Sequence, residues 1–233
     1  TLFPYTPSKI AIGQRIPAIR CPIAILEGVF STDELAAALS AQCYLVVHQP
    51  EQITLLHDYR GELDTCVWLK IDSGMHRLGL SPQAAIDAYQ QLNALAVVKE
   101  IILTSHFACA DDLQSAKTRQ QIAVFEQLSQ VLPITLAKSI ANSAGILAWP
   151  ETHYQWVRPG IMLYGSSPFA DKTASELKLQ PVMTLSSRLI AIQQVKTGET
   201  VGYGSTWQAT QDTRLGVVAM GYGDGYPRHI GRD

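Results

Sequence analysis

Short apolar runs alternate with helix-like stretches along much of the chain. The apolar runs occupy residues 22–27, 44–47, 66–71, 100–105, 136–140 and 155–157. Between most of them, apolar residues recur every three or four positions, which is the spacing of one face of a helix. Nearly continuous apolar strands that are each followed by a helix are typical of a parallel sheet buried on both faces. The pattern therefore predicts an α/β fold.

Several helix starts carry recognisable capping residues. Ser31 and Glu34 have the spacing of a capping box and predict a helix through about residue 40. Ser81 followed by Pro82 predicts an N-cap and first helical residue. A longer helix is predicted over residues 112–131, after the fourth apolar run.

The number of strands leaves the architecture open. Six strands suit an open doubly wound sheet, whereas a (β/α)₈ barrel of the TIM type needs eight. No GxGxxG follows any run, which disfavours a dinucleotide site.

The pattern changes after about residue 180. Residues 182–192 alternate between apolar and polar, 196–199 resemble a turn, and 214–220 form another strand-like run. We therefore expect an α/β domain over residues 1–178 and a β-rich domain over residues 179–233. About three strands with open edges make a poor independent unit, so we expect the β-rich domain to be partial.

Composition narrows the class of protein. The chain is 47% hydrophobic and 16% charged, which excludes a disordered chain. With 18 basic and 20 acidic residues, it lacks the positive excess typical of nucleic-acid or membrane binding. No apolar run is long enough to span a bilayer. The four cysteines form no CxxC pair and the histidines show no metal-ligand spacing, so we expect reduced thiols, a cytoplasmic protein and no metal.

Polar side chains follow several of the apolar runs. They are Lys70, Asp72, Arg77, His106, Asp111, Asn142, Ser143 and Arg158, and Gly160 follows the last of them. The carboxyl ends of parallel barrel strands are where such folds build their sites, although any one of these residues alone is more often an ordinary loop residue. Ser143 precedes a short predicted helix and Gly160 permits close backbone approach, which suggests a phosphate site.

Five motifs resemble those of bacterial alanine racemases, in order and spacing, from about residue 21 to 228. They are WLKIDSGMHRLG at 68–79, SHFA at 105–108, WVRPGIMLYG at 156–165, VGYGSTW at 201–207 and GYGDGY at 221–226. The resemblance implies a (β/α)₈ barrel followed by a β-rich domain, pyridoxal 5′-phosphate (PLP) as cofactor and a head-to-tail homodimer. It implies interconversion of L-alanine and D-alanine by two bases, supplying D-alanine for peptidoglycan. The six strands would then be six of eight.

The resemblance also assigns cofactor contacts. Asn142, Ser143 and the amides around Gly160 and Ile161 match the phosphate cradle. Arg158 matches an arginine that faces the pyridine nitrogen. A guanidinium donates hydrogen bonds and keeps its proton, so it holds that nitrogen unprotonated and makes the ring a weaker electron sink.

Other motif positions match catalytic residues. Tyr203 matches the base that removes the α-proton of L-alanine, in the partner subunit's site. Arg77 matches the donor to the cofactor's phenolic oxygen, and Lys70 matches an often carbamylated lysine that positions it. His106 matches a histidine in the network around Arg158. The positions that match the substrate entrance are Asp111, Tyr222 and Arg228.

One family motif has no counterpart in these residues. The Schiff-base lysine lies in a VVKANAYGHG-like segment of the first barrel strand, and Lys9 lacks those surroundings. We therefore expect the first two strands and the second base to be missing. A broad-specificity racemase and a non-catalytic, truncated remnant stay open as alternatives. A hydrolase that uses Asp72, Asp111 and His106 is disfavoured. Barrel architecture alone supports many chemistries, whereas the racemase motifs are specific.

Overall fold

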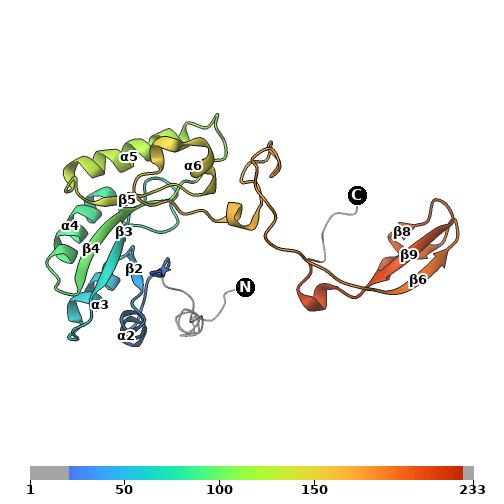
Figure 1. Cartoon of the computed structure of the whole chain (residues 1–233), viewed down its shortest axis with the longest axis horizontal. Coiled ribbons are helices and arrows are strands. Elements are labelled where there is room, and N and C mark those ends of the chain that lie inside the picture. Colours follow the sequence, from blue (N-terminus) through green and yellow to red (C-terminus); the bar gives the residue numbers. More distant parts are fainter. Residues whose placement is uncertain (1–20, 228–233) are drawn as a thin grey trace. The chain divides into compact units, whose positions relative to one another are not determined.

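The protein is described by a computed structural model over residues 21–227 (Figure 1). Lys9 and Arg228 lie outside the described residues. The chain divides into two compact units between Val182 and Met183, called here the first unit and the second unit.

A parallel sheet organises the first unit. Its strands are β1 (Ala24–Ile25), β2 (Tyr44–Val47), β3 (Thr65–Lys70), β4 (Val98–Thr104) and β5 (Ala137–Ser139). They lie side by side in the order β1-β2-β3-β4-β5, and every neighbouring pair is parallel (Figure 1). A doubly wound sheet reverses its strand order at a switch point, whereas a barrel adds strands in sequence order. The observed order therefore fits an arc of a barrel.

Helices follow the strands and cover one face of the sheet. They are α2 (Thr32–Ser40), α3 (Pro50–Asp58), α4 (Pro82–Asn93), α5 (Lys117–Val131) and the short α6 (Ser143–Ala148). Both predicted helix starts are confirmed. Ser31 accepts the Glu34 amide at 3.2 Å, and Ser81 accepts the Ala84 amide at 3.3 Å with Pro82 opening α4.

One predicted helix start and one predicted strand are wrong. Helix α5 begins at Lys117 rather than Asp112, because the Asp112 carboxylate accepts the amides of Gln114 and Ser115 at 3.0 and 3.2 Å and holds a turn. Residues 155–157 form no strand in the described chain, only a single parallel bridge between Ser139 and Trp156. The Lys138 amide donates to the Gln155 side chain at 2.9 Å rather than to a backbone carbonyl, so the pairing does not extend into a ladder. The predicted six strands are thus five strands and one bridge.

Apolar side chains fill both faces of the sheet, which explains the nearly continuous runs. Leu69 belongs to a large core beneath the helices, together with Phe125 of α5. Cys66, Trp68 and Ile102 belong to a smaller cluster on the opposite face, since successive side chains of a strand alternate. Burial, with the nearby Glu100 carboxylate, raises the pKa of Cys66 to about 12.

The second unit consists of two antiparallel pairs. Strand β6 (Leu189–Val195) pairs with β9 (Thr213–Val218), and β7 (Thr200–Val201) pairs with β8 (Trp207–Gln208). The predicted turn at 196–199 is confirmed, with Gly198 at a φ of +88°. The alternating stretch becomes a strand only at Leu189, and the β7–β8 pair was not predicted. No helix in the described chain is long and apolar enough to cross a membrane.

Candidate active site

Most of the predicted site residues lie beyond the carboxyl ends of β3, β4 and β5. Lys70 ends β3, His106 follows the last residue of β4 by two positions, and Ser143 begins α6 just after β5. Arg158 follows the bridge at Trp156. The strand order therefore brings these four side chains to one edge of the sheet, as the sequence predicts.

Arg158 is held by oxygen atoms of β4, β5 and the loop after β4. One guanidinium nitrogen donates to Thr104 Oγ1 at 2.9 Å and to the Ser139 hydroxyl, and the other donates to the Ser105 carbonyl. Thr104 and Ser139 are register partners in the sheet. Within residues 21–227, no carboxylate forms an ion pair with Arg158. Burial lowers the pKa of Arg158 to about 10, so it stays a cation at neutral pH without a paired anion.

His106 lies beside this arginine as a neutral ring. Its Nδ1 is 3.4 Å from Arg158 Nη2. Burial, and then the charges of Arg158, Lys70 and Arg77, lower the pKa of His106 to about 4. Because Arg158 can only donate, Nδ1 is the acceptor and the ring proton belongs on Nε2.

Lys70 is a partly buried amine among cations. Burial, and then the charges of Arg158 and Arg77, lower its pKa to about 8, while Asp72 acts in the opposite direction. A larger share of this amine is therefore neutral near pH 8 than for an exposed lysine.

Asp72 shapes the loop that carries Arg77. Its Oδ1 accepts the amides of Gly74 and His76 at 2.8 and 3.0 Å, and its Oδ2 contacts the His76 ring at 2.9 Å. Burial opposes ionisation, but these hydrogen bonds outweigh it and the pKa of Asp72 is lowered. Gly79 closes the loop at a φ of +134°, where a Cβ would lie 2.5 Å from the Asp72 nitrogen. The Asp72 carboxylate is thus engaged by its own loop, which argues against the hydrolase interpretation.

A second cluster of donors surrounds Ser143. Its buried Oγ accepts the amides of Gly160 and Met162 at 2.9 and 3.3 Å. Within the described residues, neither the Ser143 hydroxyl hydrogen nor the Ile161 amide has an acceptor. These two donors remain available to an anion. Asn142 instead caps α6, accepting the Gly145 amide at 3.0 Å.

The remaining described residues of the prediction come from other segments of the chain. Asp111 is exposed in the loop between β4 and α5. Tyr203 and Tyr222 belong to the second unit, where their side chains are 95% and 73% exposed. Three buried polar residues of the site, Thr104, Ser139 and Gln121, were missed by the sequence analysis. Thr104 lies at the polar end of its apolar run, which is the pattern that marks the other rim residues, whereas Ser139 lies inside a run that ends at Ile140.

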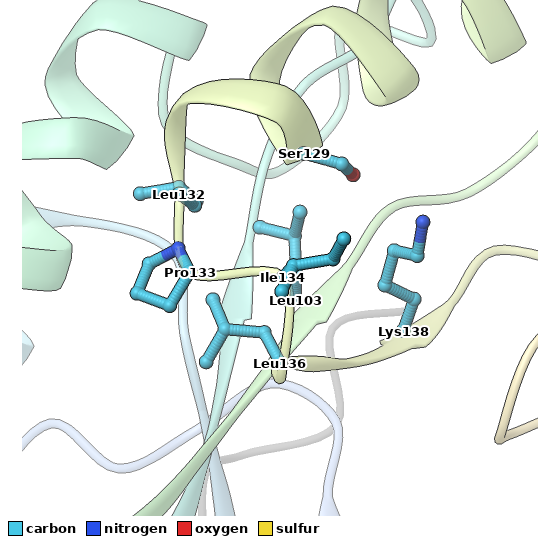
Figure 2. Close-up of a pocket in the computed structure, with 7 residues that line it drawn as sticks. All are labelled: Leu103, Ser129, Leu132, Pro133, Ile134, Leu136 and Lys138. Atoms are coloured by element: carbon cyan, nitrogen blue, oxygen red, sulfur yellow. The ribbon is translucent and has the colours of Figure 1, made fainter.

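A small apolar cavity lies elsewhere in the first unit, beneath the loop between α5 and β5 (Figure 2). Its walls are Leu103, Ser129, Leu132, Pro133, Ile134, Leu136 and Lys138. Its volume of about 30 Å³ accommodates roughly one water molecule. None of the predicted site residues lines it, so it is not the candidate active site. The described residues contain no group of three or more potential metal ligands.

Fold and site together define an α/β-barrel protein whose polar groups gather at the carboxyl ends of its strands. Two family models match the chain: "Alanine racemase, N-terminal domain" over residues 11–168 and "Alanine racemase, C-terminal domain" over residues 182–233. The chain belongs to the alanine racemase family, and its parallel sheet is part of that family's barrel.

Individual relatives agree with the family models. The chain is 49% identical over 219 residues to the alanine racemase of Vibrio parahaemolyticus and 50% identical over 221 residues to one from Vibrio vulnificus. The biosynthetic alanine racemase of Pseudomonas aeruginosa superposes with a TM-score of 0.86 at 42% identity, covering 95% of this chain. These matches cover 94% of this chain for both Vibrio proteins, and the chain spans about 61% of the length of each relative.

Proposed function

We propose that this chain carries the cofactor-binding rim and one catalytic base of a PLP-dependent alanine racemase. The observation that carries the proposal is Arg158, a partly buried cation held by neutral oxygens beside a neutral histidine. An enzyme that keeps a cofactor nitrogen unprotonated requires a donor of this kind.

The described residues fit PLP. The Ser143 hydroxyl and the Ile161 amide are free donors for a phosphate, and Arg158 is a donor for a ring nitrogen. PLP supplies an electron sink for the negative charge that develops on the α-carbon of a bound amino acid. Arg158 keeps that sink weak, which favours return of the proton to the α-carbon over transamination.

Tyr203 is the proposed base for one face of the α-carbon. Its phenol oxygen takes the α-proton of L-alanine and returns a proton to the same face when D-alanine reacts. Free tyrosine titrates near ~10, so this role needs cations close to the phenol. Arg77 and Arg158 supply such charge in a site of the first unit. We propose that Tyr203, which its own unit leaves exposed, enters the partner subunit's site.

Lys70 is proposed to be carbamylated. Its neutral amine attacks CO₂ to form a carbamate and releases one proton. The lowered pKa of Lys70 increases the reactive fraction of the amine. The product is an anion that replaces a like charge beside Arg77 with an opposite one and can then position Arg77.

The test is racemisation by a chimera. In it, the segments of the Vibrio parahaemolyticus alanine racemase that lie outside the match flank this chain. We expect turnover of L-alanine faster than of L-lysine or L-serine. Faster lysine turnover would instead support the broad-specificity alternative, and an inactive, PLP-free chimera would support the non-catalytic remnant. The identities to proteins named alanine racemase favour neither alternative.

The exchange of Tyr203 between subunits has its own test. In the chimera, Tyr203→Phe and Arg77→Ala are each expected to abolish most turnover. Mixed subunits should regain about a quarter of it, because half of the dimers are mixed and each of those has one intact site. No recovery on mixing would place Tyr203 in its own subunit's site.

The described cysteines are free thiols, which suits a cytoplasmic enzyme.

A further inference from the structure

Gln121 is a fully buried polar side chain in α5, among the apolar residues that face the sheet. Its Nε2 donates to Ser73 Oγ at 3.2 Å and to the His106 carbonyl at 2.9 Å. Its Oε1 accepts the Ala108 amide at 2.9 Å. One side chain from the helical layer therefore ties the loop after β3 to the loop after β4.

The hydrogen bonds continue from Gln121 to Arg158. Ser73 Oγ lies 2.7 Å from Ser105 Oγ, and Ser105 Oγ donates to the Ile71 carbonyl at 3.0 Å. The Ser105 carbonyl accepts from Arg158. Ser73 and Ser105 are both buried. Hydrogen bonds from the helix to Ser105, and then the Ser105 residue itself, thus connect Gln121 to the guanidinium. Removing one member of such a network weakens the remaining hydrogen bonds as well.

We infer that Gln121 is a positioning residue that fixes His106 and the Arg77 loop relative to Arg158. It acts through the His106 carbonyl, the Ala108 amide and Ser73, and it touches no reacting atom. The inference deepens the proposed function and rests on it for the roles of His106 and Arg77. The competing explanation is that Gln121 only satisfies buried loop groups and so only stabilises the fold.

The chain contains a matched control for that explanation. Gln52 of α3 is also buried, and it joins the loops after β1 and β2 in the same way. Its Oε1 accepts the His48 amide at 2.9 Å, and its Nε2 donates to the Glu27 carbonyl at 3.2 Å. None of the predicted site residues takes part in these bonds. Gln52→Met therefore removes a comparable bridge without touching His106.

The first experiment measures the titration of His106 by NMR in the full chain, with histidine labelled and His106→Gln used for assignment. In the parent chain, the charges facing the ring are Arg158, Lys70 and Arg77. We expect Gln121→Met to raise the pKa of His106 by about one unit or more, because the freed loop lets the ring reach water. Gln52→Met should leave it unchanged.

Two results would overturn the inference. One is a folded Gln121→Met chain whose His106 titrates as in the parent, and the other is an equal shift in Gln52→Met. If Gln121→Met does not fold, Ser73→Ala decides. That variant removes one member of the path, and we expect a smaller shift in the same direction. An unchanged His106 in Ser73→Ala would then refute the positioning role.

A second readout uses the chimera. Gln121→Met should lower kcat by about tenfold or more, since small misplacements of catalytic groups are costly, while KM for alanine changes less. Gln52→Met should retain the parent kcat. An inactive parent chimera would count against the proposed function, whereas the NMR titration would still decide whether Gln121 positions His106.

Discussion

The two units hold their functional residues in different ways. In the first unit, Arg158 and Ser143 are fixed by hydrogen bonds at the edge of a sheet with apolar clusters on both faces. In the second unit, Tyr203 is 95% exposed, and apolar strand residues such as Leu189 and Ile190 are 62% and 66% exposed. The first unit organises its own site, whereas the second displays side chains whose placement its own core does not determine.

The difference predicts that function and stability separate in the second unit. Tyr203→Phe in the chimera should lower L-to-D turnover by about 10²–10⁴-fold, the usual contribution of a general base, while PLP stays bound. The melting temperature should change little, because Tyr203 contributes almost no buried contact to its own unit. Turnover and thermal melting of the same preparation check both parts. Near-normal turnover would exclude Tyr203 as the base.

Core truncations should sharpen the contrast. Phe125 is fully buried in the first unit, so Phe125→Ala should lower the free energy of unfolding by about 3–5 kcal/mol. The matched change in the second unit, Ile190→Ala, should alter it by less than about 0.5 kcal/mol. Hydrogen exchange followed by mass spectrometry reports each unit separately. A loss of protection of similar size in both units would break the comparison.

Glycine substitutions test the same difference in the backbone. Gly79→Ala combines a positive φ with a clash against the Asp72 amide. We expect it to lower the free energy of unfolding by about 3 kcal/mol. Gly198 also has a positive φ, but its Cβ would meet no atom within 4 Å. Gly198→Ala should therefore cost only about 1 kcal/mol. Urea unfolding measures the free energy of unfolding of both variants. Equal decreases would show that the loop around Gly79 shifts enough to relieve the clash.

A further contrast is a pH dependence confined to the first unit. His106 titrates near 4 in the folded chain and at 6.5 when unperturbed, so between these values the unfolded state binds more protons. Stability of the first unit should rise with pH across this window, and His106→Gln should flatten the rise. In the second unit, hydrogen bonds from Lys196 and Thr197 lower the pKa of Asp212 below 3.8, outside the window. Urea unfolding followed by tryptophan fluorescence measures the slope, and an unaltered slope in His106→Gln would contradict this assignment.

Local patterns predicted much of the first unit. Capping residues located the starts of α2 and α4, and the apolar runs located β2, β3 and β4. The run at 155–157 failed as a strand because the Gln155 side chain accepts the Lys138 amide, a contact that periodicity does not register.

The site was predicted less completely than the fold. Family motifs identified Arg158, but they did not show that Thr104 and Ser139 hold it, because those contacts join residues far apart in sequence. Gln121 was missed although its position was informative. It shares the buried face of α5 with Phe125 and Leu128, at spacings of four and seven. A glutamine on such a face is a pattern that sequence analysis can seek.

Because the Cys66 thiol is buried, the rate of its chemical labelling measures how often the sheet opens to solvent. Its thiol lies on the face that also carries Trp68, and its high pKa leaves almost no thiolate at neutral pH. A thiol-specific reagent added in excess can react at this position only as fast as that face opens to solvent. The exposed Cys21 thiol provides the reference reaction in the same molecule. The ratio of the two labelling rates therefore reports how often the inner face of the sheet is uncovered.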